Sequence, residues 1–240
     1  MTEFKHQGAE KKKYVKEMFD DISENYDFLN HLLSFGIDFY WRSRLVKFIQ
    51  PENSQTILDV ATGTGDVGFA LLKKNDNINV IGLDYAFNMV KIGLHKARKR
   101  NIDNFAFLQG DGEQLPFKDN QFNALTIAYG FRNIGHYDLA LKEFYRVLKP
   151  NGKLAILEFS TPKSKIFDVL YQWYFKNILP KIAGLFSRSD AYRYLPESVE
   201  NFPERSEMLK MIKSSGFTNP GCIDLTFGVT SIFHGTKTEP

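Results

Sequence analysis

The sequence predicts an α/β protein, in which helices cover both faces of a parallel sheet and an antiparallel hairpin closes the chain. Three observations support this prediction. An apolar run over residues 56–60 leads through a glycine-rich turn into a helical segment over 67–73, a unit that brings backbone close to a ligand. Strands and helices then alternate up to residue 159, as they do around a parallel sheet. Finally, two strand-like runs meet at Phe227-Gly228, which is typical of a hairpin.

The composition is that of one globular domain. The 240 residues are 43% hydrophobic, enough for a single large core and too much for a disordered chain. A net charge of +3 gives no reason to expect a nucleic-acid partner, but it permits weak attraction to an anionic membrane. The single cysteine, Cys222, cannot form an internal disulfide, which fits a reducing compartment.

We expect a cytoplasmic protein without an integral membrane segment. The first ten residues lack the apolar stretch of a signal peptide. The most apolar later stretch, residues 166–186, contains Asp168, Lys176, Pro180 and Lys181, whereas a membrane helix needs about 20 predominantly apolar residues.

The first elements should form a helical cap over residues 11–50. Apolar residues recur at helical spacing over 13–19 and 40–49. The second helix should end before Pro51, because the residue ahead of a proline disfavours the α conformation.

Residues 51–160 should form the cofactor-binding core. The fourth strand of this core is apolar on both faces, as expected of a central parallel strand. The expected strands are 56–60, 79–84, 105–109, 122–129 and 152–159, and the expected helices are 67–73, 87–100 and 139–148.

Beyond residue 160 the pattern changes. An aromatic-rich helical region over 166–182 is followed by a stretch over 184–204 that reads as an irregular lid. A helix over 205–214 and strands over 221–227 and 229–237 should close the chain. The prediction is therefore a single domain over 1–240, divided into the cap, the core, an aromatic substrate lid over 161–204, and a closing helix and hairpin over 205–240.

The glycine-rich turn follows a strand that contains Asp59 and is expected to cradle a ligand. Gly63 and Gly65 would let the ligand lie against the backbone, because a Cβ atom would block the approach. Between them, Thr64 offers a hydroxyl and an N–H group.

The ends of the next two strands carry acidic residues. Asp84 can accept two hydrogen bonds from a ribose diol, although a carboxylate there could also cap the following helix. Asp111 could accept from an adenine amino group while Gly112 leaves room for the ring, and the alternative for Asp111 is an ordinary turn residue.

The residues alone leave the adenosine ligand open. Gly63-x-Gly65-x-x-Gly68 satisfies the dinucleotide fingerprint, and Asp84 lies at about the right distance for the acid that binds the ribose of NAD. An NAD enzyme, however, would need a second mononucleotide-binding half, and the terminal hairpin is not the usual dehydrogenase arrangement.

The order Asp59-x-Ala61-x-Gly63-x-Gly65, then Asp84, then Asp111 resembles the class I S-adenosylmethionine-dependent methyltransferases. This resemblance implies a Rossmann-like fold with a C-terminal antiparallel hairpin and S-adenosylmethionine as the cofactor. The residues that it assigns to the cofactor are Asp59, Gly63, Thr64, Gly65, Asp84, Asp111 and Gly112.

Further motifs over residues 14–237 resemble the ubiquinone/menaquinone-biosynthesis C-methyltransferases. These motifs are Tyr26-Asp27-x-x-Asn30, Leu33-Ser34-Phe35-Gly36, Trp41-Arg42, Tyr129-Gly130-Phe131-Arg132-Asn133, Leu157-Glu158-Phe159-Ser160 and Tyr192-x-Tyr194. The resemblance implies methylation of a ring carbon of a polyprenyl hydroquinone. Demethylmenaquinol is the favoured acceptor, and a ubiquinone-pathway benzoquinol or another small molecule is the alternative. A non-catalytic scaffold would be expected to have lost the glycine turn, Asp84 or Arg132, all of which are present.

The resemblance assigns catalysis to Arg132, beside Asn133. A hydroquinone carbon becomes a good nucleophile when its neighbouring hydroxyl is ionised, and bringing a phenol pKa of about 10 toward 7 costs roughly 4 kcal/mol. A buried guanidinium could supply much of this by stabilising the phenolate, whereas the alternative is a structural arginine. Asp38 stands where the family often has a histidine, so the proton acceptor stays open.

The acceptor is expected to contact Tyr26, Asn30, Trp41, Tyr129 and Tyr194, on the same resemblance. The ring and tail would extend into the aromatic region, whose alternative role is packing on the sheet; it comprises Phe167, Tyr171, Trp173, Tyr174, Phe175 and Tyr192. Because such a tail lives in lipid, this face could meet the bilayer peripherally, at the inner face of the membrane, or a second subunit in a homodimer. No metal is expected, since the histidines lack ligand spacing.

Overall fold

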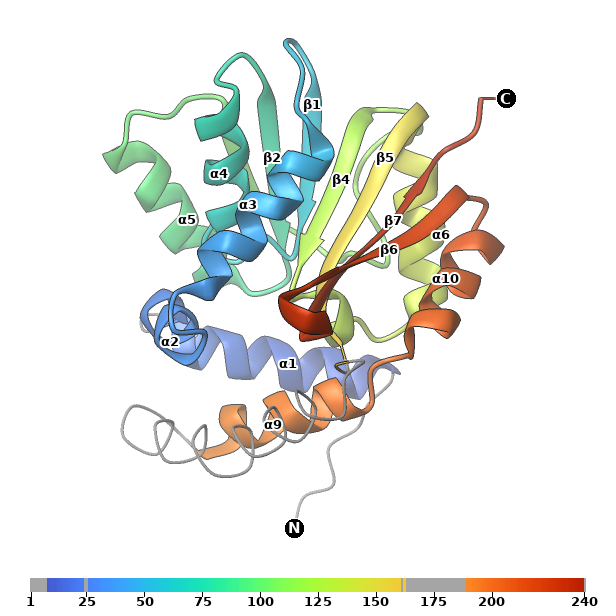
Figure 1. Cartoon of the computed structure of the whole chain (residues 1–240). Helices are drawn as coiled ribbons and strands as arrows, with labels where there is room; N and C mark the ends of the chain where they lie inside the picture. Colours follow the sequence, from blue (N-terminus) through green and yellow to red (C-terminus); the bar gives the residue numbers. More distant parts are fainter. Residues whose placement is uncertain (1–7, 24–25, 161, 163–188, 240) are drawn as a thin grey trace.

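The computed structural model describes residues 8–23, 26–160, 162 and 189–239. These residues form a seven-stranded sheet in the order β3-β2-β1-β4-β5-β7-β6 (Figure 1). The strands are β1 (Thr56–Val60), β2 (Asn79–Asp84), β3 (Phe105–Gln109), β4 (Phe122–Ala128), β5 (Leu148–Phe159), β6 (Thr218–Leu225) and β7 (Thr230–Thr236). The first five are parallel, and β7 pairs antiparallel with β5 and β6. The predicted α/β fold and terminal hairpin are confirmed.

The order of the strands places a crevice at one edge of the sheet. The chain passes from β1 to β2 and β3 on one side, and β4 and β5 lie on the other side of β1. The loops that leave β1 and β4 therefore diverge at the carboxyl edge, which is where ligands bind in open α/β sheets.

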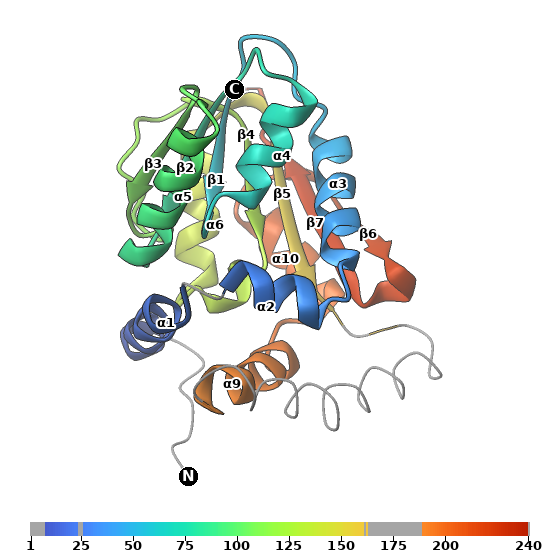
Figure 2. The same ribbon diagram turned by 90° about the vertical axis from the view of Figure 1, so that its left-hand side faces the viewer.

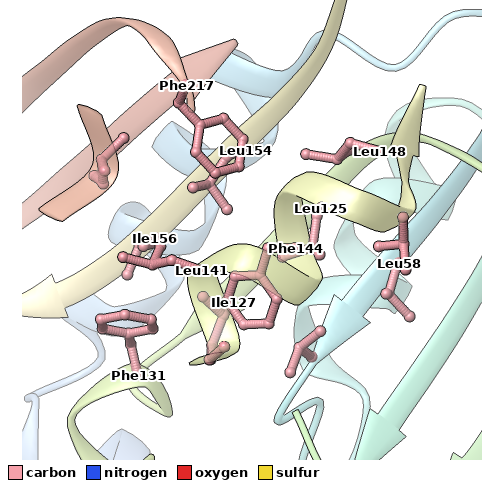
Figure 3. Close-up of a cluster of buried hydrophobic side chains, with 14 of the residues drawn as sticks. Leu58, Leu125, Ile127, Phe131, Leu141, Phe144, Leu148, Leu154, Ile156 and Phe217 are labelled. Atoms are coloured by element: carbon pink, nitrogen blue, oxygen red, sulfur yellow. The ribbon is translucent and has the colours of Figure 1, made fainter. Parts of the chain in front are cut away.

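Helices cover both faces of the sheet, and each face has its own core. Leu45 and Leu71 pack with Ile57 and Ala124 on one face, whereas Phe144 and other residues of α6 and α10 pack on the opposite face (Figure 3). Neighbouring strand residues enter different cores because side chains alternate across a strand. The helices are α1 (Gly8–Ile22), α2 (Tyr26–Leu33), α3 (Ile37–Ile49), α4 (Asp66–Lys74), α5 (Phe87–Lys99), α6 (Tyr137–Val147), α9 (Ser189–Glu200) and α10 (Arg205–Ser214).

The first helix of the predicted N-terminal cap, α1, lies across the carboxyl edge of the sheet, whereas α3 packs on one face (Figure 1). Figures 1 and 2 show α1 running beneath the ends of the parallel strands, with α9 on its outer side. Val15 and Met18 of α1 are buried together with Tyr194 of α9. Two segments that are far apart in the sequence thus meet at the edge where a ligand is expected.

Residues 189–200 of the predicted lid form helix α9, so the prediction of an irregular stretch over 184–204 is wrong for those residues. Helix α9 contains Pro196, and the two prolines of this region suggested a broken chain. Tyr194 and Ser198 are nevertheless buried, at 2% and 4% exposure. Their spacing of four residues gives α9 one face that packs on the molecule, and such packing outweighs the cost of a proline. The helical region expected over 166–182 lies outside the described residues.

Two other elements differ slightly from their predicted boundaries. The helix expected from residue 40 starts at Ile37, directly after Gly36 in the left-handed conformation (φ 74°). The closing hairpin turns through a short 3-10 segment, η4 (Thr226–Gly228), rather than a two-residue loop. Within the described ranges, none of the helices has the length and apolar character needed to cross a membrane.

Candidate active site

A cavity lies between the carboxyl edge of the sheet and α1. Lys12, Val15, Lys16 and Phe19 of α1 form its outer wall. The predicted residues that line it are Tyr26, Gly63, Asp84, Asp111, Gly112, Tyr129 and Asn133. The fold thus brings together side chains from the predicted cap, glycine turn and strand ends.

One end of the cavity, which we call the carboxylate end, is formed by Asp84, Asp111 and Gly112 after β2 and β3. Asp84 accepts hydrogen bonds from the backbone N–H groups of Gly63 (2.7 Å) and Ala86 (2.9 Å). Burial raises the pKa of Asp84 to about 6, although these hydrogen bonds favour its ionised form. Each carboxylate oxygen can accept a further bond, so Asp84 can hold the glycine turn and a ribose diol together.

Asp111 is held by the cap. Lys12 of α1 donates to Asp111 at 2.6 Å and to Glu113 at 3.2 Å. Asp111 also accepts from the backbone N–H of Glu113 (2.9 Å). A Cβ atom on Gly112 would lie 3.1 Å from Val60 Cγ1, so glycine leaves the space that a flat ring would need. The sequence reasoning did not identify Lys12; its signal was a run of three lysines at positions 11–13.

Two glycines with positive φ shape the glycine turn, in which Ala61 also has positive φ (49°). Gly63 (φ 56°) lines the cavity, and a Cβ atom there would lie 3.6 Å from the Tyr26 ring. Gly65 (φ 93°) precedes α4, and a Cβ atom there would lie 2.8 Å from the Phe107 ring. Gly63 therefore leaves room for a ligand, whereas Gly65 is needed for packing on β3.

Thr64 and Asp59 lie behind the cavity wall. The Thr64 hydroxyl donates to Asp27 (2.5 Å) and accepts from Lys96 (2.7 Å), which ties α2 and α5 to the turn. Asp59 is 1% exposed and accepts from the hydroxyls of Thr62 and Thr126, both at 2.6 Å. Burial raises the pKa of Asp59 to about 7. In the described structure both side chains hold the turn in shape.

The other end of the cavity is lined by Tyr26 and by Asn133 of the short 3-10 turn η2 (Phe131–Asn133) after β4. We call it the arginine end, because Arg132 of the same turn lies directly behind this wall. Arg132 is 7% exposed. Its Nη1 donates to the fully buried Glu158 and to the Tyr129 carbonyl, each at 2.6 Å. Its Nε has no hydrogen-bond partner in the described part of the chain. Burial alone would lower the pKa of Arg132, but the charge of Glu158 raises it.

Asn133 connects the arginine end to the lid helix. The Tyr194 hydroxyl donates to Asn133 Oδ1 at 3.0 Å, and Asn133 lines the cavity. Tyr26 also lines it, and Asn30 hydrogen-bonds to the Tyr26 side chain. Burial raises the pKa of Tyr26 and Tyr194, so both phenols stay neutral. Neutral phenols and an amide around a buried guanidinium suit a polar aromatic ligand.

Trp41 and Tyr129 form an aromatic layer beside this end. Their ring centroids lie 6.1 Å apart, and both rings approach Phe159. Trp41 is buried and donates from Nε1 to Thr226 at 2.7 Å. Tyr129 lines the cavity, whereas Trp41 stands behind it.

Asp38, where the resembled family often has histidine, is a buried acceptor. It receives hydrogen bonds from His31 (2.6 Å), Ser34 (2.7 Å) and Arg42 (2.6 Å). Burial alone would raise the pKa of Asp38, but these partners lower it overall. A carboxylate with three donors is a poor proton acceptor, which argues against Asp38 as a base.

The predicted aromatic contacts over 167–175 lie outside the described residues, as does the side chain of Tyr192. The site that remains has an acidic end, suited to hydroxyl and amino groups, and a cationic end, suited to an oxygen anion. A cavity of this kind can hold a nucleoside and place a second, aromatic molecule beside it.

Comparison with known proteins agrees with this geometry. The model of the ubiE/COQ5 methyltransferase family matches residues 6–237. A ubiquinone/menaquinone biosynthesis C-methyltransferase from Geotalea daltonii is 43% identical over 231 residues, which cover 95% of this chain and 98% of the relative. A demethylmenaquinone methyltransferase from Thermus thermophilus is 44% identical over 221 residues, 92% of this chain and 100% of the relative. The crystal structure of a SAM dependent methyltransferase from Aquifex aeolicus has a TM-score of 0.61 at 19% identity, covering 81% of this chain and 88% of that one.

Proposed function

This chain belongs to the ubiE/COQ5 methyltransferase family, and from that premise we propose that it methylates a ring carbon of demethylmenaquinol to give menaquinol. The methyl donor is S-adenosylmethionine, as the sequence predicted. The observation that supports an ionisable acceptor is the buried Arg132 directly behind one end of the cavity, with an Nε donor that is unpartnered among the described residues.

The residues at the carboxylate end fit the methyl donor, S-adenosylmethionine. When bound, S-adenosylmethionine supplies an electrophilic methyl carbon on a positively charged sulfur, which leaves as a neutral thioether. Asp84 would bind the ribose hydroxyls and Asp111 the adenine amino group. Gly63 and Gly112 leave the space that a Cβ atom would fill beside Tyr26 and Val60. The lining residues therefore fit an adenosine compound without rearrangement of the sheet.

Arg132 would stabilise the ionised hydroxyl of the acceptor, next to the carbon that is methylated. Its guanidinium stays protonated, so it cannot take the proton itself. The hydroxyl and ring-carbon protons would leave to water or to a carboxylate. Asn133, Tyr26 and Tyr194 would orient the ring by hydrogen bonds, and Trp41 would support Tyr129 from behind. Holding the ring in line with the methyl group is the main contribution of such a site.

The lid and the neighbouring surface support a lipid-borne acceptor. Large apolar side chains near the start of α3 are exposed, among them Ile37 (40%), Phe39 (58%) and Tyr40 (49%). We propose that this surface lets the protein touch a membrane peripherally. Co-sedimentation with anionic vesicles tests the contact, and sedimentation equilibrium tests the homodimer predicted from the sequence.

The acceptor is tested by anaerobic incubation of the protein with labelled S-adenosylmethionine and reduced short-tail demethylmenaquinone. Mass spectrometry should find methylated menaquinol. Binding of the cofactor by calorimetry without any product would contradict the acceptor assignment. The benzoquinol of the ubiquinone pathway would then be the alternative, since the name of the Geotalea relative covers both pathways.

A further inference from the structure

Lys11 of α1 is buried behind the cavity wall, next to the segment that follows η2. Its side chain is 3% exposed, although lysines are almost never fully buried unless they are paired. The ammonium group donates to the Ile134 carbonyl at 2.9 Å and to the Tyr137 hydroxyl at 3.4 Å, and it lies 5.1 Å from the centre of the Tyr137 ring. None of these contacts is an ion pair.

Lys11 is linked to the turn that carries Arg132. The Tyr137 hydroxyl, which receives the hydrogen bond from Lys11, donates its own to the Arg132 carbonyl at 3.2 Å. Gly8 of the same helix donates its N–H to the Gly135 carbonyl at 3.1 Å. Helix α1 is thus hydrogen-bonded to the segment directly after η2 and, through Tyr137, to the Arg132 carbonyl, so the position of α1 and that of Arg132 depend on each other.

The charges at this end do not balance. Arg132 forms an ion pair with Glu158 at 2.6 Å. The other nearby carboxylate, Glu113, already pairs with Lys12 (3.2 Å) and His136 (2.9 Å). Burial and the charge of Arg132 lower the pKa of Lys11 to about 8, against the opposite effects of Glu158 and Glu113. An anion near Lys11 and Arg132 would interact favourably with both cations.

The neighbouring phenols do not supply that anion. Burial raises the pKa of Tyr26, Tyr137 and Tyr194, so they stay neutral. With Lys11 charged, the buried group of Lys11, Arg132 and Glu158 has two positive charges and one negative charge. In a site of low dielectric such an excess charge acts strongly on a neighbouring ionisable hydroxyl.

We infer that Lys11 is a positioning residue for methyl transfer, which fixes the turn of Arg132 and Asn133 and provides the excess positive charge that favours an ionised acceptor. Because Glu158 offsets part of the charge of Arg132, Lys11 supplies a second cation that adds to the effect of Arg132. The inference rests on the proposed function only in requiring an acceptor with an ionisable hydroxyl.

The pKa of a bound phenol tests the inference without any methyl transfer. The probe is 1-naphthol, titrated by its absorbance on the protein saturated with S-adenosylhomocysteine. Lys11→Met keeps the length of the side chain and removes the charge, and Lys11→Arg keeps the charge. Lys13→Met is the matched control, since Lys13 lies on the same helix but is exposed.

The wild-type protein should bind 1-naphthol with a pKa at least about one unit, or tenfold, below that in Lys11→Met. Lys11→Arg and Lys13→Met should behave as the wild type. An equal naphthol pKa in wild type and Lys11→Met, or no bound naphtholate in the wild type, would overturn the inference. Failure of the proposed function would appear differently, as absence of methyl transfer to quinols by the wild type.

Turnover gives a second readout. Lys11→Met should lower kcat at least about tenfold, as expected when one electrostatic contribution to the transition state is lost, while the Kd for the cofactor changes little. A lysine is charged below its pKa, so wild-type kcat should decline as the pH rises above about 8. Lys11→Arg should retain kcat there. Parallel loss of kcat and cofactor affinity in Lys11→Met would indicate a merely structural residue and contradict the inference.

Discussion

The two ends of the cavity use buried charge in opposite ways. At the carboxylate end, Asp84 accepts hydrogen bonds from the backbone N–H groups of Gly63 and Ala86, and burial raises its pKa to about 6. At the arginine end, Arg132 is held by Glu158, and Lys11 adds a second cation. One end is built to accept hydrogen bonds from a neutral ligand, and the other to stabilise an anion. Substitutions at the two ends should therefore separate binding from turnover.

The largest effect is expected for Arg132→Ala. Loss of the cation should lower kcat about 100- to 1000-fold, as for other groups that stabilise a developing anion, while the cofactor Kd changes by less than about threefold, because Arg132 lies outside the carboxylate end. Steady-state kinetics and calorimetry make this measurement. A parallel fall in cofactor affinity would show that the assignment to Arg132 is wrong.

A double variant separates chemistry from stability. Arg132→Ala leaves Glu158 buried without its cation, which costs about 3–5 kcal/mol in comparable buried pairs. Arg132→Met combined with Glu158→Gln removes both charges and should recover most of that stability in urea unfolding. Its kcat should stay as low as that of Arg132→Ala. Recovery of turnover together with stability would indicate a structural arginine.

The next effect is expected at the opposite end. Asp84→Asn should raise the cofactor Kd about 10- to 100-fold, because hydrogen bonds to a charged group contribute about 1.5–3 kcal/mol. The kcat at saturating cofactor should change far less. Asp76→Asn, at an exposed position after α4, is the control. If Asp84→Asn lowered kcat more than affinity, the division between the two ends would fail.

The pH dependence of cofactor binding should be smaller still. Asp84 is ionised above its pKa of about 6 and loses an acceptor when it is protonated below that value. Affinity should therefore fall several-fold between pH of about 7.5 and about 5, as measured by calorimetry. Asp84→Asn should bind the cofactor with little dependence on pH over this range, and an equal dependence in the variant would assign the effect to another group.

The smallest effect is expected for Trp41→Phe. Loss of the hydrogen bond to Thr226 should lower the free energy of unfolding by about 1 kcal/mol, with the cofactor Kd unchanged. Urea unfolding and calorimetry check both quantities. A raised KM for the quinol at unchanged stability would instead show that Trp41 contacts the acceptor, as the sequence resemblance implied.

The glycine turn and the strand ends could be predicted because their signals are local. Gly63 and Gly65 adopt positive φ in one short turn, and Asp84 ends the strand that follows. By contrast, Pro196 predicts a break in a segment that is in fact helical. This segment is helical because α9 packs on α1, nearly 180 residues away in the sequence. The local conformational preferences of residues identify a turn, but they do not include the stabilisation that packing against a distant segment provides.

By itself the sequence determined the α/β fold, the terminal hairpin and the acidic residues at the strand ends, because period-2 and helical patterns and glycine turns are encoded by neighbouring residues. Only the tertiary structure decided how the charges are paired. The salt bridge of Arg132 with Glu158 joins the ends of adjacent strands, and Lys12 reaches Asp111 over a separation of 99 residues. Lys11, one of three successive lysines, becomes buried because α1 crosses the edge of the sheet. Burial and distance determine the energy of the interaction between two charges, and both depend on the folded structure.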